Sequence, residues 1–344
     1  MVEITKKAKG YGLLSRRREE LMGIAMLWVM LFHAYAFHFQ VAALDTVKEL
    51  GFSGVDGFFL LSGVGLYGSI VRRESEPFSA YFARRCARVL PAYWLVVGIY
   101  SLWLRAQGRI SLKTALWSLS TFHYWFHIPG SFNWYIPALL LFYLLAPFWV
   151  RLLRRSRCKG LLTILAFPAA YGLYRLSIPV GLNYMSDFLD RVPAFALGLL
   201  AGCCISEGTP LTRKHAAAWA AGAAAGAVTA FLLARGVLYI STCYIAAAFV
   251  MPLCLFFAKT LDVLHWEPLC RILRFFGTYS LEIYLLNVVV TREFETLAPW
   301  FDRDGRHAAY YLTVYALNLL LAYLLHNGIE KILRPKVRAL LRKA

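Results

Sequence analysis

Long apolar runs separated by short charged segments dominate the pattern of this chain. Most of these runs approach or exceed the roughly 17–25 residues that a helix needs to cross a bilayer. A membrane β-barrel would instead show short segments of alternating hydrophobicity, and we find none. We therefore predict an all-α, polytopic integral membrane protein with about ten transmembrane helices, at residues 21–40, 54–71, 88–105, 133–150, 160–178, 191–206, 215–234, 237–258, 276–291 and 308–328.

Two further segments are amphipathic, and we do not expect them to span the membrane. Residues 112–128 are aromatic and half polar, which favours an interfacial or re-entrant helix. In the tail, residues 329–344, bases alternate with Leu and Val, so we expect a helix on the inner leaflet. No extramembrane stretch is long enough to fold alone. We predict a single domain over residues 1–344, with a cytoplasmic segment at 1–20, a bundle at 21–328 and a basic cytoplasmic tail.

The distribution of charge sets the expected orientation. Apolar residues make up 60% of the chain and charged residues 16%, with a net charge of +18. The bases form no stripe on a soluble domain, so we expect membrane lipids and no nucleic acid as partners. Both termini are expected in the cytoplasm, because 27 of the 37 Lys and Arg residues then lie on the inner side, in residues 1–20, 72–88, 151–159, 207–215, 259–274 and 329–344.

His33 lies in the first apolar run, between Leu21 and Phe39. An imidazole in hydrocarbon costs free energy unless it has a partner or faces a water-filled cavity. His33 is therefore a candidate catalytic residue, and a hydrogen bond between packed helices is the alternative interpretation.

The second run, GFSGVDGFFLLSGVGLYG, combines glycines with two polar residues. Asp56 enters the predicted span and Ser62 lies near its middle, so both are candidate contacts for substrate or an oxyanion. The glycines allow another helix, or a ligand chain, to approach the backbone, and helix packing is the simpler of the two interpretations.

Arg84, Arg85 and Arg88 precede LPAYW at the predicted inner surface. On a helix, Arg85 and Arg88 share a face. Two guanidinium groups on one face suit a phosphate or pyrophosphate ligand, although a positive-inside topology signal is the simpler interpretation of a bare RRxxR.

Two later segments contribute further polar candidates. Asn133 and Trp134 are expected at the outer interface, where an aromatic belt is the default interpretation for Trp. Glu282 lies inside a predicted span and should face a partner or a cavity, which makes it a second catalytic candidate. Asn287, further along that span, can hydrogen-bond across helices.

Taken in order, these motifs resemble the membrane acyltransferase-3 family, whose members O-acylate surface polysaccharides. The resemblance rests on a His in the outer part of the first span, then VDGFFLLSG, RRxxR with LPAYW, NWYIPALLLFYLLAP, RVPAFALGLLAG and SLEIYLLN. It extends from about Arg16 to Asn287, and the ordered set is more specific than any single motif.

The resemblance implies a membrane O-acyltransferase. Such an enzyme moves an acyl group, often acetyl, from cytoplasmic acyl-CoA to a hydroxyl of an extracytoplasmic cell-envelope carbohydrate. The acceptor is then an envelope glycan or a lipid-linked sugar. The protein is expected to be a multi-pass protein of a bacterial plasma membrane. Acyl-CoA (acetyl-CoA) serves as co-substrate, and no metal is required because a thioester is already activated.

The resemblance also assigns roles to residues of this chain. His33 becomes the general base or proton relay, since a neutral imidazole can take the proton of a sugar hydroxyl. Arg85 and Arg88, with Arg84 beside them, become contacts of the CoA phosphates. Ser62 and Asn287 are candidate donors to the developing oxyanion. His33, Glu282 and the Ser62 region are then expected to line one cavity.

The chain departs from the family pattern at two positions. Eleven residues before His33, where the family usually has a basic residue, this chain has Met22, and the nearest arginine is Arg18. Asn287 stands where the family often has His, and an amide cannot shuttle a proton at neutral pH. A transporter or flippase-like relative, or a non-catalytic relative that binds a ligand, therefore remains an alternative.

Overall fold

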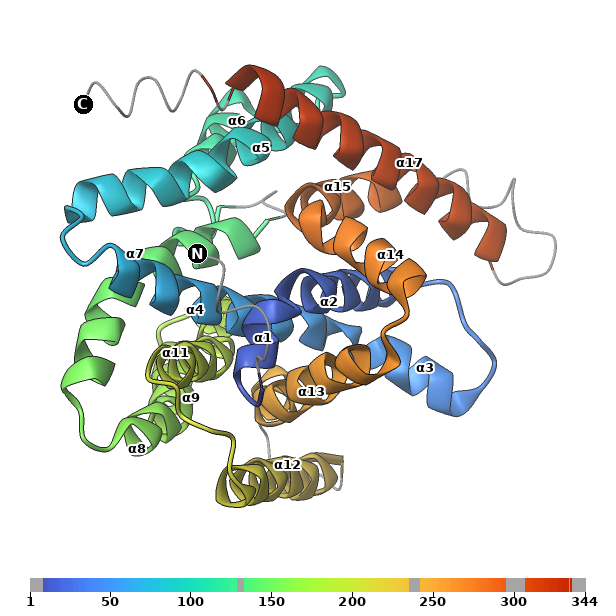
Figure 1. Cartoon of the computed structure of the whole chain (residues 1–344). Helices are drawn as coiled ribbons and strands as arrows, with labels where there is room; N and C mark the ends of the chain where they lie inside the picture. Colours follow the sequence, from blue (N-terminus) through green and yellow to red (C-terminus); the bar gives the residue numbers. More distant parts are fainter. Residues whose placement is uncertain (1–8, 129–132, 235–241, 295–306, 334, 336–344) are drawn as a thin grey trace. The chain divides into compact units, whose positions relative to one another are not determined.

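The computed structural model describes residues 9–128, 133–234, 242–294, 307–333 and 335. These residues form helices and no strands (Figure 1). The α-helices are α1 (Gly12–Arg16), α2 (Arg18–Phe32), α3 (Ala42–Glu49), α4 (Gly54–Arg72), α5 (Phe78–Ala106), α6 (Leu112–Leu119), α7 (Tyr135–Arg155), α8 (Lys159–Ile164), α9 (Ala166–Ser177), α10 (Ser186–Leu189), α11 (Val192–Ser206), α12 (Arg213–Ala234), α13 (Thr242–Leu264), α14 (Glu267–Thr278), α15 (Ser280–Glu293) and α17 (Ala308–Gly328). Three short helical turns are η1 (Leu50–Ser53), η2 (Asn183–Met185) and η4 (Ile329–Leu333).

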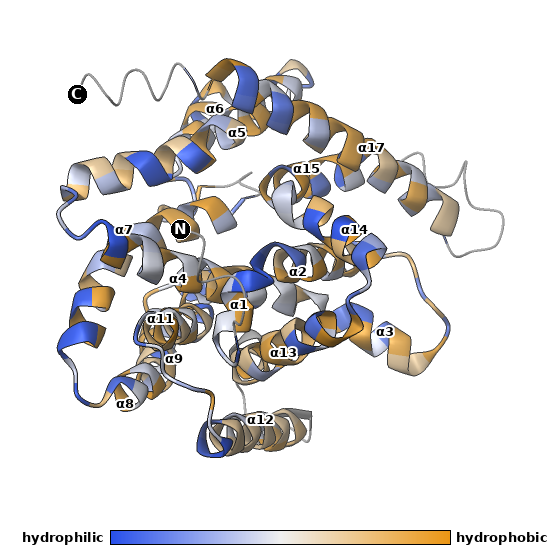
Figure 2. Cartoon of the chain, viewed as in Figure 1, coloured by the Kyte–Doolittle hydropathy of each residue, from blue (hydrophilic) through white to orange (hydrophobic). Residues whose placement is uncertain are grey.

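Seven helices in the described chain are long and apolar enough to cross a membrane, or up to eight if the bent pair α14 and α15 is one span. Apolar residues cover much of α13 and α17 (Figure 2). The predicted span at 308–328 coincides with α17, and those at 54–71 and 88–105 lie within α4 and α5. The predicted span at 237–258 begins outside the described residues and continues into α13. The protein is thus an all-helical, multi-pass membrane protein, and the predicted number of about ten spans is not confirmed.

The prediction of a helix across residues 21–40 is wrong at its end. Helix α2 stops at Phe32, and His33 begins a turn. The N–H of Ala36 donates to the hydroxyl of Tyr311 on α17 over 3.1 Å. In a longer helix this N–H would bond the carbonyl of Phe32. A tertiary hydrogen bond therefore takes the donor that a continuing helix would need.

Two other predicted spans are interrupted. Residues 160–178 form α8 and α9 in place of one helix. Pro168 has no N–H with which to bond the carbonyl of Ile164, whereas in the first turn of α9 that donor is not needed. Residues 276–291 contain the junction of α14 and α15, which are bent by 70° relative to one another.

Neither segment predicted to be amphipathic forms a long helix in the described residues. Residues 112–128 contain the eight-residue helix α6, which is too short to span, followed by turns. Within the tail, η4 is a π-helical turn. Residue 334 and residues 336–344, where most of the predicted interfacial helix falls, lie outside the described residues.

Contacts group the chain into two compact units, which are described separately. Unit 1 comprises Met1–Ala25, Phe52–Glu74 and Leu145–Gly277. Unit 2 comprises Met26–Gly51, Ser75–Leu144 and Thr278–Ala344.

In unit 1, α11 packs along α4 with the two backbones in direct contact (Figure 1). A methyl group at Gly198 would lie 2.1 Å from the carbonyl oxygen of Leu60, and one at Gly63 would lie 2.7 Å from that of Phe195. Glycine at these positions permits the close approach. Of the two interpretations of the glycine pattern, packing against another helix is therefore the one observed.

Unit 1 also joins segments that the charge pattern predicts to be cytoplasmic. Arg154 donates to Glu74 over 2.6 Å, which links residues 72–88 to 151–159. Lys159 pairs with Glu207, and Arg16 pairs with Asp262. Each of these ion pairs requires its two segments to lie on the same side of the membrane. Which side that is stays a prediction.

In unit 2, α15 packs against α17. Their apolar cluster consists of five buried residues, Ala34, Val290, Tyr310, Tyr311 and Val314. The hydroxyl of Tyr310 donates to the carbonyl of Thr291 over 2.8 Å, so the cluster also fixes the relative position of the two helices.

Candidate functional site

His33 lies directly after α2 in unit 2 and is half-buried. Its ring Nδ1 is 2.8 Å from the carbonyl oxygen of Val29. A carbonyl oxygen only accepts, so in the neutral ring Nδ1 carries the proton and Nε2 holds the lone pair. The rings of Phe32 and Tyr35 lie roughly edge-on to the imidazole, with centroids 5.3 and 5.7 Å away. This tautomer presents Nε2 as a proton acceptor.

The three arginines of α5 have different surroundings in unit 2. Arg84 is held by Glu76, with Nε 3.1 Å from the carboxylate. Arg85 instead lies against two rings, with its guanidinium carbon 5.6 Å from the centroid of Tyr81 and 5.9 Å from that of Tyr143. Its Nε and one terminal nitrogen are buried and have no hydrogen-bond partner among the described residues. Arg88, one turn further, is exposed.

Asn133 is a helix cap in unit 2. Its side-chain oxygen accepts the N–H of Ile136 over 3.0 Å, in the first turn of α7. Its carbonyl accepts a hydrogen bond of 2.8 Å from Nε2 of His123, which is buried. Burial lowers the pKa of the His123 imidazole, and this hydrogen bond opposes the shift. Trp134 is half-buried and lies roughly perpendicular to the ring of Tyr135.

Glu282 has a histidine partner that the sequence argument did not single out. Nδ1 of His326, near the end of α17, is 3.0 Å from a carboxylate oxygen of Glu282, which is buried. Nε2 of the same ring is 3.9 Å from Glu330 in η4, and the ring of Tyr279 packs edge-on at 4.8 Å. A carboxylate that holds one nitrogen of an imidazole orients the ring for acid–base chemistry. His326 is an ionisable residue inside a predicted span, and the rule that singled out Glu282 would have found it.

Asn287 hydrogen-bonds across helices, as its structural interpretation proposed. Its side-chain oxygen accepts from Nδ2 of Asn318 on α17 over 3.4 Å. The amide nitrogen of Asn287 and the amide oxygen of Asn318 are buried and have no partner among the described residues. This contact therefore leaves one donor and one acceptor without a partner among the described residues.

Asp56 forms a buried ion pair in unit 1. One of its carboxylate oxygens is 3.4 Å from a terminal nitrogen of Arg191, which directly precedes α11. The side chains are 0% and 4% exposed. Removing one partner of such a pair leaves an uncompensated buried charge. Asp56 thus pairs α4 with the residue before α11, and Arg191 is a partner that the sequence did not reveal. Ser62, on α4, is half-buried.

A family model described as an acyltransferase domain matches residues 21–329, most of the chain. The chain belongs to the acyltransferase-3 family. No curated protein and no solved structure matches it. An acyltransferase activity follows from this membership in general terms.

At the position where the acyltransferase-3 family usually has a basic residue, this chain has Met22, which is buried in α2. Arg18, one turn earlier, reaches α4, where its Nε donates to the carbonyl of Leu61 over 3.1 Å. A methyl group at Gly65 would lie 3.3 Å from that Nε, so the glycine leaves room for the guanidinium. Arg18 therefore places a positive charge beside the helix that carries Ser62.

The candidate residues of this acyltransferase fall into two sets. Asp56 and Ser62 belong to unit 1. The members in unit 2 are His33, Arg84, Arg85, Arg88, Asn133, Trp134, Glu282 and Asn287. Convergence of His33, Glu282 and the Ser62 region on one cavity stays a prediction.

Proposed function

We propose that this protein is a membrane O-acyltransferase that moves an acyl group, with acetyl expected, from cytoplasmic acyl-CoA to a hydroxyl of an extracytoplasmic cell-envelope carbohydrate. Membership in the acyltransferase-3 family carries the proposal. The apolar helices long enough to span a membrane support it, because donor and acceptor lie on opposite sides. The proposed location is the plasma membrane of a bacterium.

The proposed base is Nε2 of His33. The acceptor hydroxyl gives its proton to Nε2 while its oxygen bonds to the carbonyl carbon of the thioester. The carbon–sulfur bond then breaks, the ester leaves with the acceptor, and the CoA sulfur takes the proton from the imidazolium. The hydrogen bond between Nδ1 and Val29 supports this role because it leaves the lone pair on Nε2.

The proposed donor contacts are Arg85 and Arg88. Buried nitrogens on Arg85 that lack partners in the described chain support a contact with an anion. Glu282 is proposed to act with His326 as a proton-handling pair. Ser62 and Asn287 remain proposed donors to the oxyanion, and the amide nitrogen of Asn287, which has no partner in the described part of the chain, supports this role. Trp134 and Asn133 are proposed to lie near the acceptor.

The decisive experiment uses purified protein in liposomes with acetyl-labelled acetyl-CoA and candidate envelope glycans. Wild-type protein should transfer label to a glycan, and His33→Ala should lose about 100- to 10,000-fold in rate, the usual contribution of a general base. His38→Ala is the matched control, because His38 is exposed and lies five residues away. Wild-type-like transfer by a folded His33→Ala protein removes His33 from catalysis.

The same assay tests the alternative of a transporter or a non-catalytic relative. Met22 favours that alternative, since an uncharged residue stands at the family's basic position. A transporter would move a glycan or an acyl-linked small molecule without cleaving the thioester. Intact acetyl-CoA after incubation with protein and every candidate glycan would therefore favour the alternative.

A further inference from the structure

An open polar cavity of about 560 Å³ lies in unit 1, at the start of α2. Four arginines line it together with His265 and three carboxylates. We name it the arginine pocket, after Arg16, Arg17, Arg18 and Arg274. It shares no residue with the proposed donor contacts on α5.

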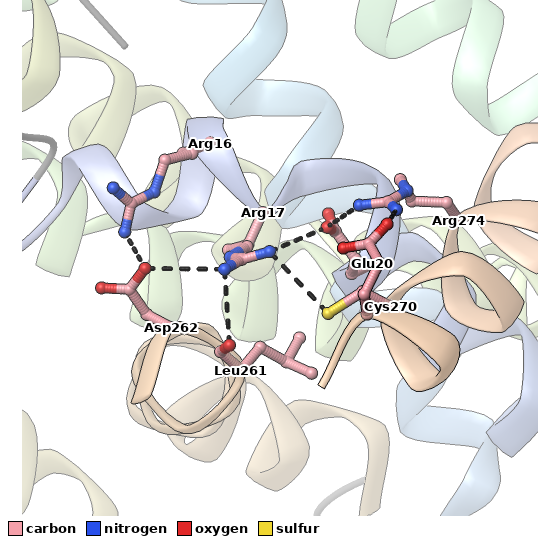
Figure 3. A network of polar contacts seen from close by, with 8 residues as sticks. Arg16, Arg17, Glu20, Leu261, Asp262, Cys270 and Arg274 are labelled. Atoms are coloured by element: carbon pink, nitrogen blue, oxygen red, sulfur yellow. Dashed lines mark hydrogen bonds and ion pairs between the residues drawn. The ribbon is translucent and has the colours of Figure 1, made fainter. Parts of the chain in front are cut away.

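The break between α1 and α2 spreads the three consecutive arginines. Helix α1 ends at Arg16, Arg17 leaves helical geometry (φ −98°, ψ 20°), and α2 begins at Arg18. Arg16 therefore reaches Asp262 on α13, whereas Arg17 reaches Glu20 and the carbonyl of Leu261 (Figure 3). A continuous helix would separate these side chains by about 100° per residue around one axis.

Two glycines bring the fourth arginine to the pocket. A methyl group at Gly23 would lie 1.9 Å from the carbonyl oxygen of Leu273, and one at Gly277 would lie 1.9 Å from that of Glu19. Helices α2 and α14 thus touch through their backbones. This contact places Arg274 3.2 Å from Glu20 (Figure 3).

The lining of the arginine pocket has one more guanidinium group than it has carboxylates. Asp262 serves both Arg16 and Arg17, the latter at 3.6 Å. Glu20 serves both Arg17 and Arg274, each at 3.2 Å. Arg274 also pairs with Glu267, which does not line the pocket. The lining has four guanidinium groups, each with five N–H donors, and three carboxylates. The Nε atoms of Arg16 and Arg17 are buried and have no partner in the described part of the chain.

We propose that the arginine pocket binds the phosphate groups of an anionic ligand, a phosphomonoester or a diphosphate, through residues other than Arg85 and Arg88. Guanidinium groups bind phosphate oxygens through paired, charge-assisted hydrogen bonds. Residues 1–20 and 259–274, which form the pocket, are both predicted to be cytoplasmic. The ligand is therefore a soluble cytoplasmic phosphate compound or the headgroup of an inner-leaflet lipid. The proposal goes beyond acyl transfer, and direct binding tests it without the enzymatic assay.

The test measures binding of inorganic pyrophosphate, by calorimetry, to the full chain in phosphatidylcholine discs. Arg17→Gln and Arg274→Gln should each weaken binding by about tenfold. Arg151→Gln is the matched control, because Arg151 is exposed, lies in unit 1 outside the pocket and is also predicted to be cytoplasmic. It should change the affinity less than about twofold. Equal weakening by all three variants would indicate attraction to net charge and overturn the proposal.

A second measurement needs no variant that endangers folding. Pyrophosphate should slow the modification of Arg16 and Arg274 by phenylglyoxal in the wild-type protein and leave Arg151 unaffected, as read by mass spectrometry of peptides. Absence of this protection overturns the proposal, whatever the acyl-transfer assay gives. Discs with phosphatidic acid distinguish the two sources. If phosphatidic acid in the discs weakens the binding of pyrophosphate, the ligand of the pocket is a lipid headgroup. If the affinity for pyrophosphate is unchanged, the ligand is a soluble compound.

Discussion

Arg84, Arg85 and Arg88 carry the same charge on one helix, yet their surroundings give them different chemistry. Arg84 already has a carboxylate partner in Glu76. Arg85 lies between aromatic rings and keeps donors without partners in the described chain. The net contribution of a partly exposed ion pair is small, whereas guanidinium nitrogens without a partner among the described residues are available to an anion. At the scale of single residues, the local partners therefore decide which arginine can bind a ligand.

These surroundings predict unequal effects on the acyl donor. Arg85→Gln and Arg88→Gln should each raise the KM for acetyl-CoA by about tenfold, because each removes a charge-assisted contact with phosphate. Arg84→Gln, the matched control, should raise it less than about threefold. Steady-state kinetics in liposomes at two salt concentrations check this, since added salt should narrow the difference. An equal rise in KM for all three variants would contradict specific contacts and indicate that the arginines act only as a general positive surface.

At the scale of elements, the contact between α4 and α11 depends on the absence of side chains. Gly63 and Gly198 lie where a Cβ would meet the partner helix backbone, and Gly202 lies against the side chain of Tyr67. Close packing through small residues is a main source of helix association in membranes. The buried pair Asp56 and Arg191 then fixes the position of the two helices.

The packing predicts that Gly198→Ala destabilises the protein by about 1–3 kcal/mol, because the new methyl group forces the helices apart. Gly222→Ala is the control within another helix, α12, because nothing lies within 4 Å of the place that its new methyl group would take. That variant should be neutral or stabilising by roughly 0.5–1 kcal/mol. Thermal unfolding in detergent measures both. Equal stabilities of the two variants would contradict a tight contact between α4 and α11.

The sequence predicted elements whose cause is local and missed those whose cause is distant. The length of the apolar runs is sufficient to predict α4, α5 and α17. The end of α2 depends on Tyr311, which is 275 residues from Ala36, and no local pattern marks it. His326 was within reach of the argument applied to Glu282, but their pairing across 44 residues was not. The hydrogen bond of Asn287 across helices was predicted, because a lone amide in a membrane helix usually bonds a neighbouring helix.

At the scale of the whole molecule, charge and contacts agree on which segments belong together. Glu74 with Arg154, and Lys159 with Glu207, link predicted cytoplasmic segments within unit 1. Such pairs cannot form across a bilayer. Either orientation that keeps these segments on one side satisfies the pairs, and the positive-inside rule predicts the one with both termini in the cytoplasm.

This arrangement predicts the accessibility of cysteines in intact cells. Cys158 is exposed and expected inside, so a membrane-impermeant maleimide should not label it. Gln107→Cys, at the predicted outer end of α5, should be labelled. Both are measured in a Cys243→Ser background, because Cys243 lies near a predicted outer end. Labelling of Cys158 in intact cells, with Gln107→Cys protected, would reverse the orientation.

The ion pairs of the arginine pocket also bear on how the protein is made. Arg16 and Asp262 are separated by 246 residues, and neither unit is a continuous stretch of chain. At a synthesis rate of about 5–20 residues per second, Arg16 waits roughly 10–50 s for Asp262 to be added to the nascent chain. During that interval the carboxylate on α13 that pairs with Arg16 of α1 does not yet exist. The arginine pocket is therefore completed only after α13 and α14 have been synthesised.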